Sequence, residues 1–154
     1  MSATQTVIPA GYRVTITSWE NDADNYKDTI HEGLSKERVE YILELCKLFK
    51  SGSNNGGATF GNMYDPDEEE IERADAAIRG VLEKYRPVLD EYELEQLDIV
   101  ADPDDEYSGP EFSAIVSEFL DSSEGYQYRV YDGAKVEYIP HKITMEDVTS
   151  QFKV

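Results

Sequence analysis

The chain of 154 residues lacks the features of a disulfide-stabilised, secreted or membrane protein. Its single cysteine, Cys46, has no partner for an internal disulfide, so the cysteine content does not require an oxidising compartment. Residues 1–10 contain neither the basic nor the apolar segment of a signal peptide, and no later run approaches the roughly 20 apolar residues that span a bilayer. These absences predict a soluble, cytoplasmic protein.

Positive charge is also scarce. Only 14 lysines and arginines accompany 33 aspartates and glutamates, which leaves a formal net charge of -19. This charge repels DNA, RNA and anionic membranes, so it argues against direct nucleic-acid binding and favours a basic protein partner. The alternative is that the charge serves only solubility. A hydrophobic content of 40% and an aromatic content of 11% predict a folded, single-domain chain.

Signatures of catalysis and of cofactor binding are missing as well. His31 and His141 have no neighbours at metal-ligand spacing, and no local pattern marks a nucleophilic serine. The segment Ser51–Asn62 is rich in glycine and asparagine but has no lysine to reach a phosphate, so we interpret it as a flexible loop. We therefore predict no enzyme activity, no cofactor and no metal.

Calcium is the one metal that the acidic runs suggest as a bound ion. Asp102, Asp104 and Glu106 alternate as the first ligands of an EF-hand loop do. Tyr107, however, occupies the position at which the sharp turn of that loop requires glycine. The pattern predicts weak, adventitious binding in place of a dedicated calcium site.

Strand periodicity occurs near both ends of the chain. Tyr12, Val14 and Ile16 alternate with polar residues, as in a half-buried strand, and Tyr26–Glu32 is expected to return as a second strand. Residues 1–10 show no period and are expected to form a loose terminus.

The C-terminal third predicts a β-hairpin. Its strands are Tyr126–Tyr131 and Lys135–Ile139, on either side of the turn residues 132–133. A three-residue loop would set Val130 opposite Val136, so that like side chains share a face.

Four segments show the apolar spacing of amphipathic helices. Ser35 is a suitable N-cap for the first, and Asp65 followed by proline is a suitable start for the second. Thr144, with Asp147 three residues later, predicts a capping box for a short final helix. The four helical segments cover residues 35–49, 65–86, 88–98 and 110–120.

These elements predict an α+β fold. A small, mainly antiparallel sheet, made of the N-terminal strand or strands and the C-terminal hairpin, is expected to pack against three or four helices. Residues 11–154 would form a single domain with a flexible loop at 51–62.

The acidic residues are concentrated between Asp65 and Glu111. This stretch holds 18 acidic and 4 basic residues, a net charge of -14 in less than a third of the chain. Carboxylates three or four residues apart on a helix lie about 5–6 Å from one another, while duplex DNA carries about one charge per 1.7 Å of axis. A folded acidic surface can therefore imitate a nucleic acid in front of a basic groove. The residues expected to bind the partner are Asp67, Glu68, Glu69, Glu70, Glu91, Glu95, Asp98, Asp104, Asp105 and Glu106.

Residues 11–26 (GYRVTITSWENDADNY) and 124–133 (EGYQYRVYDG), together with the helix after Ser35, resemble small, functionally uncharacterised proteins of large tailed bacteriophages that infect enteric bacteria. The resemblance supplies no catalytic residues. It implies a protein made in the cytoplasm of an infected bacterium, where small acidic phage proteins often resemble inhibitors of host nucleases, restriction systems or transcription.

Two functional hypotheses of different classes remain. In the first, a non-enzymatic protein binds and inhibits a basic host protein, such as a nucleic-acid enzyme or a defence factor, by nucleic-acid mimicry. In the second, a small enzyme or ligand-binding domain has its site under the loop 51–62, near Trp19 and the tyrosine-rich hairpin. A minor structural component of the virion is a further alternative.

Overall fold

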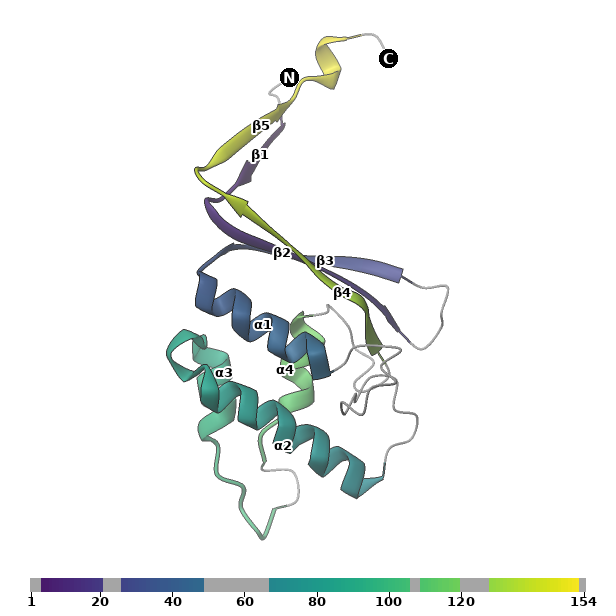
Figure 1. Cartoon of the computed structure of the whole chain (residues 1–154), viewed down its shortest axis with the longest axis vertical. Coiled ribbons are helices and arrows are strands. Elements are labelled where there is room, and N and C mark those ends of the chain that lie inside the picture. Colours follow the sequence, from purple (N-terminus) through teal and green to yellow (C-terminus); the bar gives the residue numbers. More distant parts are fainter. Residues whose placement is uncertain (1–3, 21–25, 49–66, 106–108, 120–127, 153–154) are drawn as a thin grey trace.

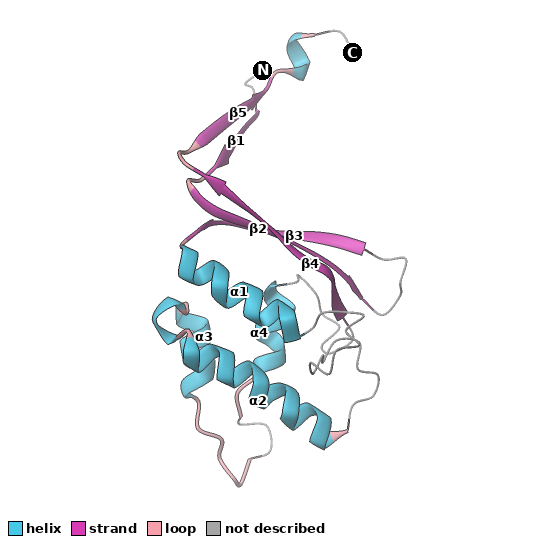
Figure 2. Ribbon diagram, viewed as in Figure 1, coloured by secondary structure: helices cyan, strands magenta, loops and turns pink. Residues whose placement is uncertain are grey.

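A computed structural model describes residues 4–20, 26–48, 67–105, 109–119 and 128–152. These residues form two antiparallel sheets, one of three strands and one of two, together with four α-helices. Figures 1 and 2 show the helices gathered on one side of the three-stranded sheet, with the two-stranded sheet leading away from them. The α+β prediction is therefore confirmed.

The strand β2 (Gly11–Glu20) is central in the three-stranded sheet. It pairs antiparallel with β3 (Tyr26–Leu34) on one side and with β4 (Tyr128–Ile139) on the other. Val14 and Ile16 are fully buried and belong to the hydrophobic core, as their alternation with polar residues predicted. The predicted second strand is confirmed in β3.

The predicted C-terminal hairpin is wrong, because β4 is one strand. Val136 pairs with Val14, and Val130 pairs with Ser18, so both halves of β4 lie along β2 instead of along each other. Residues 131–133 lie at a register shift between the two halves, as in a β-bulge. With 10 residues, β2 is long enough to pair with both halves, and the aspartate and glycine expected in a turn lie within the strand instead.

Residues 4–8, which were predicted to lie in a loose terminus, form a strand. The strand β1 (Thr4–Ile8) pairs antiparallel with β5 (Ile143–Asp147), and we call this two-stranded sheet the arm. Most arm side chains are exposed, so neither strand has the buried alternating face that reveals a strand in a sequence.

The predicted capping box near the C-terminus is also wrong. Thr144 lies inside β5 and opposite Val7, so it cannot begin a helix. Asp147 Oδ1 instead accepts a hydrogen bond of 2.9 Å from the backbone N–H of Thr149, at the start of the short 3₁₀ helix η3 (Thr149–Gln151). The final helical turn therefore starts later than predicted.

The helix α1 (Lys36–Leu48) packs against the sheet on one side and against α2 on the other. Ser35 is its N-cap as predicted, because its Oγ accepts a hydrogen bond of 3.1 Å from the backbone N–H of Arg38. The apolar spacing predicted for this helix is confirmed, since α1 contributes to the core from several turns. Its buried residues are Val39, Tyr41, Ile42, Leu45 and Cys46.

The helix α2 (Glu68–Lys84) is capped by Asp67, whose Oδ1 accepts a hydrogen bond of 2.8 Å from the backbone N–H of Glu70. The N-cap predicted from sequence, Asp65, lies outside the described residues. α2 ends before the 3₁₀ helix η1 (Arg86–Val88), because the proline of η1 cannot continue an α-helix. The predicted buried stripe is confirmed at Ala74, Ile78, Val81 and Leu82.

The helices α3 (Glu91–Asp98) and α4 (Phe112–Phe119) complete the helical layer. α3 is shorter than predicted, because Asp90 caps it through a hydrogen bond of 2.8 Å from the backbone N–H of Glu93. The apolar stripe of α4 is confirmed as core. Its buried residues are Phe112, Ile115, Val116 and Phe119.

Gly80 offers a test of helix α2. Gly80 is exposed, and a Cβ atom added there would meet no heavy atom within 4 Å. The substitution Gly80→Ala is therefore expected to raise the free energy of unfolding by about 0.5–1 kcal/mol, measured by urea denaturation, because alanine loses less backbone entropy in a helix. Gly11→Ala is the control and should destabilise, since Gly11 has φ +116° and its added Cβ would lie 3.1 Å from the Leu34 carbonyl oxygen.

Candidate functional site

The ten carboxylates predicted to bind a partner, here called the acidic set, come from α2, α3 and the chain that links α3 to α4. Asp67 and the first turn of α2 supply the first four members. Their charges face the positive end of the helix dipole, which gives them a stabilising role within α2 as well. Glu106 lies outside the described residues.

The carboxylates of α3 divide between two sides of the helix. Glu91 and Glu95 are exposed and make no hydrogen bond or ion pair with any described residue. Asp98 is also exposed, but its Oδ1 lies 2.9 Å from Arg86 Nη2, and this hydrogen bond lowers the pKa of Asp98. Glu93, which was not among the predicted residues, points inward and is only 3% exposed.

The remaining members lie in a turn after α3. The backbone N–H of Asp104 donates to Asp102 Oδ1 at 2.9 Å, and that of Asp105 donates to the Asp102 carbonyl oxygen at 3.0 Å. Asp104 and Asp105 are exposed. Figure 1 shows this turn at the end of the molecule opposite the arm.

The described members of the acidic set all belong to the helical side of the molecule, but they form two groups. Arg79 Nη1 on α2 donates to the Leu97 carbonyl oxygen of α3 at 3.4 Å, so α3 lies beside the C-terminal half of α2. Glu69 precedes Arg79 by ten residues, which is about 15 Å along the helix axis. The acidic set is therefore an extended surface and not a compact cluster.

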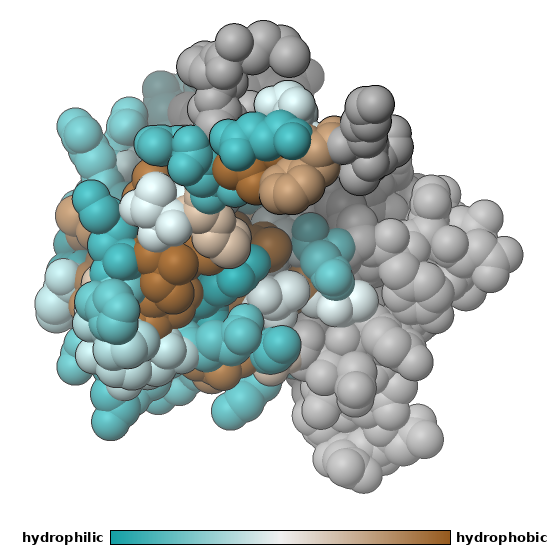
Figure 3. All heavy atoms as spheres, turned by 90° about the horizontal axis from the view of Figure 1, so that it is seen from above, coloured by the Kyte–Doolittle hydropathy of each residue, from teal (hydrophilic) through white to brown (hydrophobic). Residues whose placement is uncertain are grey.

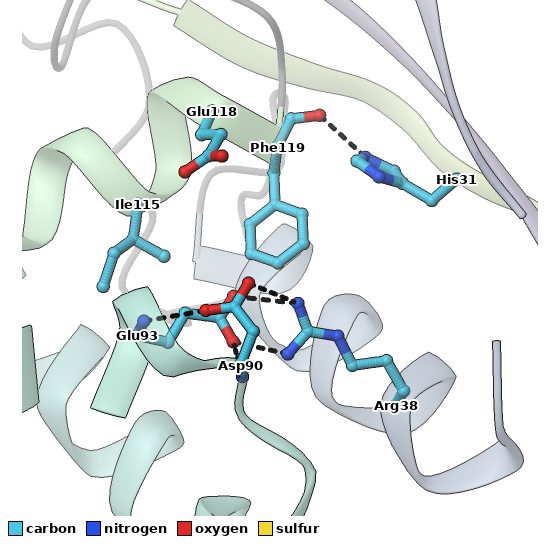
Figure 4. A pocket seen from close by; sticks show the side chains of 7 residues that line it. All are labelled: His31, Arg38, Asp90, Glu93, Ile115, Glu118 and Phe119. Carbon is cyan, nitrogen blue, oxygen red and sulfur yellow. Dashed lines mark hydrogen bonds and ion pairs between the residues drawn. The ribbon is translucent and has the colours of Figure 1, made fainter. Parts of the chain in front are cut away.

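A pocket of about 150 Å³ opens between β3, α1, α3 and α4. It combines charged, aromatic and aliphatic side chains, which Figure 4 shows from close by. Its lining residues are His31, Arg38, Asp90, Glu93, Ile115, Glu118 and Phe119.

A bidentate ion pair between Arg38 and Glu93 forms one wall of the pocket. Arg38 Nη1 lies 2.5 Å from Glu93 Oε1, and Nη2 lies 2.9 Å from Oε2. Both side chains are largely buried, at 17% and 4% exposure. Burial opposes the charge of Arg38, but the hydrogen bond and negative charge of Glu93 outweigh it and raise the pKa of the guanidinium. The pair thus joins α1 to α3.

Further hydrogen bonds complete this network. Arg38 Nη1 also donates to the Val88 carbonyl oxygen at 2.9 Å, and Glu93 Oε1 accepts from the backbone N–H of Asp90 at 2.9 Å. Glu93 therefore belongs to a capping box with Asp90 while it pairs with Arg38. Each oxygen of this buried carboxylate has a partner, as a buried charge requires.

Aromatic rings surround the guanidinium. Its carbon lies 4.8 Å from the centre of the Tyr41 ring and 5.6 Å from that of Phe119, within the range of cation–π attraction. His31 Nε2 lies 2.9 Å from the Phe119 carbonyl oxygen, so the tautomer protonated at Nε2 donates a hydrogen bond to the end of α4. Several of the charged and aromatic side chains that line the pocket therefore bind other residues of the same chain.

The described side chains offer little support for covalent chemistry. Burial raises the pKa of the Cys46 thiol to about 12, so this cysteine is not a nucleophilic thiolate at neutral pH. Among the described residues, no group of three histidine, cysteine or carboxylate side chains is placed to hold a metal ion. No helix among the described residues is long and apolar enough to cross a bilayer.

The ligand site predicted near Trp19 and under residues 51–62 lies outside the residues whose side chains the structure describes. The pocket that the structure describes lies elsewhere, and sequence reasoning missed its central residue, Glu93. A signal was present, because Asp90 and Glu93 have the spacing of a capping box just before the apolar residues of α3.

No protein family, curated protein or solved structure matches the chain.

Proposed function

We propose that the protein is a non-enzymatic binding protein whose acidic set engages and inhibits a basic partner. The partner would be a nucleic-acid enzyme or a defence factor of an infected bacterium, in whose cytoplasm the protein would act. The observation that carries this proposal is the exposed side of α3, where Glu91 and Glu95 lie one helical turn apart without a cation from the described residues.

Three of the four basic residues between Asp65 and Glu111 are engaged within the chain, and the fourth, Arg73, is exposed on α2. Lys84 Nζ lies 2.6 Å from Glu44 Oε1, and Arg86 pairs with Asp98. Arg79 donates to α3 and lies with its guanidinium 5.0 Å from the centre of the Phe112 ring. These side chains are held by their own partners, so the outward carboxylates keep a strong negative field that a basic groove could neutralise.

Nucleic-acid mimicry supplies the mechanism. A groove built to neutralise phosphates releases counterions when a rigid array of carboxylates takes their place, as it does when it binds DNA. The extended shape of the acidic set suits an elongated groove better than a small pocket. Binding of this kind should weaken as salt screens the charges, and duplex DNA should compete with it.

The test is charge reversal on the acidic set. Substituting Glu69, Glu91, Glu95 and Asp104 by lysine is expected to abolish capture of partners from a bacterial lysate while leaving the circular dichroism spectrum unchanged, because these side chains are exposed. Proteins captured by the wild-type chain should be released by raised salt and by short duplex DNA.

A matched control reverses Glu32, Glu37, Glu40 and Glu137, which are also exposed but belong to β3, α1 and β4. This control changes the net charge by the same amount, so a loss of capture common to both variants would reflect total charge and would contradict a role for the acidic set. Capture that survives reversal of the acidic set, or that duplex DNA does not displace, would contradict mimicry.

A further inference from the structure

The arm presents two open strand edges. Among the described strands, β1 and β5 pair only with each other, and Figures 1 and 2 show them leading away from the helices. A two-stranded sheet alone is marginally stable in water, and further strands or a packed face are needed to stabilise it. The arm is therefore a place where an additional strand would be favourable.

One side of the arm is partly apolar, because Ile8, Ile143 and Met145 share it with Thr4, Thr6 and Asp147. Paired residues of an antiparallel sheet point to the same side, so Ile8 and Ile143 lie together, and Met145 lies on that side two residues further along β5. Ile143 is 39% exposed and Met145 is 51% exposed. Figure 3, which views the molecule from the end where the arm lies, shows apolar side chains interspersed with hydrophilic ones at this end.

The arm itself carries a net charge of only -2, from Glu146 and Asp147 on β5. Residues 1–10 contain no charged side chain, and residues 140–154 contain two lysines and two carboxylates. The whole net charge of -19 therefore lies in residues 11–139. Two copies of such an acidic body repel each other, and the arm is where that repulsion is weakest. A weakly charged, partly apolar arm on a strongly acidic body fits a second copy of this chain.

We propose that the arm is a dimerisation surface, in which β1 of one copy pairs antiparallel with β1 of a second copy. β1 has no charged side chain, whereas β5 carries Glu146 and Asp147, which would lie near their own counterparts if β5 paired with β5. The β1 pairing is two-fold symmetric and joins both arms into one four-stranded sheet. Strands of 5 residues bury less than about 1,200 Å², so the dimer is weak.

Sedimentation equilibrium tests the dimer with the wild-type chain. The average mass is expected to rise from 17.5 kDa toward twice that value as the protein concentration increases. Raising the salt from about 0.1 M to about 1 M shortens the Debye length from about 10 Å to about 3 Å, and this should strengthen the dimer by screening the acidic bodies from each other. Capture of a basic partner should weaken under the same change, so the two proposals can fail separately.

Paired substitutions on one side of the arm locate the interface. Gln5→Lys with Val7→Lys adds two positive charges to β1, and a pairing centred on Thr6 would place each lysine opposite another. This variant is expected to weaken the dimer by about tenfold. The control, Thr144→Lys with Glu146→Gln, changes the charge equally on the β5 partners of the same two residues and should leave the dimer intact.

Amide hydrogen exchange of the wild-type chain gives a readout that needs no variant. Backbone amides of β1 should gain protection as the protein concentration rises, while those on the outer edge of β5 should not. A mass that stays at 17.5 kDa at every concentration and salt would overturn the proposal. So would a control variant that weakens the dimer as much as the β1 variant, or new protection confined to β5.

Discussion

The substitution Arg38→Met is expected to lower the free energy of unfolding by about 3–5 kcal/mol. It leaves Glu93, which is 3% exposed, without the guanidinium that compensates its charge. It also removes the hydrogen bond to the Val88 carbonyl oxygen and the cation–π contact with Tyr41. Chemical denaturation measures the loss, which is a large part of the roughly 5–15 kcal/mol that stabilises an ordinary domain.

Two further variants test whether the burial of the Arg38–Glu93 pair causes this loss of stability. Arg86→Met removes an exposed pair with Asp98 and should cost less than about 1 kcal/mol, because solvent screens this pair. Combining Arg38→Met with Glu93→Leu should recover most of the loss, since two apolar side chains can replace a buried pair without leaving an isolated charge. A loss for Arg38→Met no larger than that for Arg86→Met would show that the network does not hold α1 to α3.

A second large effect is expected at Phe119. Its ring is 9% exposed and lies 5.7 Å from the Tyr41 ring and 5.3 Å from the His31 ring, measured between ring centres. Phe119→Ala should therefore destabilise the protein by about 3–5 kcal/mol, because it opens a cavity where α4 meets α1 and β3. Urea denaturation monitored by circular dichroism provides the measurement.

Phe152 serves as the control for aromatic truncation. It is 66% exposed, and Phe152→Ala is expected to change stability by less than about 0.5 kcal/mol. Phe119→Leu should give an intermediate loss, since leucine fills part of the same volume. Equal effects of Phe119→Ala and Phe152→Ala would be inconsistent with a packed junction at the end of α4.

The helices and the central strand could be predicted because they bury one face. Val14 and Ile16 on β2 repeat with the period of a strand, and Ile78 and Leu82 on α2 repeat with the period of a helix. Local patterns of this kind are set by neighbouring residues, so they can be read without knowing the tertiary structure. The α+β class followed from them.

The pairing of the strands could not be predicted in the same way. The aspartate and glycine at 132–133 favour a hairpin locally, but the long edge of β2 pairs with both halves of β4. β1 finds its partner at the other end of the chain and buries little, so no local signal marks it. The first error arises because pairing between distant segments overrides turn propensity, and the second because such pairing leaves no local signal.

Only part of the candidate site could be predicted from the sequence. Charge counting identified the acidic stretch, and the exposed Glu91 and Glu95 are members of it. The same counting could not separate Glu93, which points inward, or Asp98, which pairs with Arg86. Arg38 lies 55 residues from Glu93, so their pairing depends on how α1 and α3 pack and has no signature along the chain.

The position of β2 between β3 and β4 also determines when folding can finish. β3 follows β2 closely, but β4 begins only at Tyr128, so during synthesis on the ribosome one edge of β2 stays open until the C-terminal part of the polypeptide emerges. Long-range pairing of this kind slows folding, and an open edge attracts other nascent chains. Interrupted translation would therefore leave a fragment that is prone to aggregate.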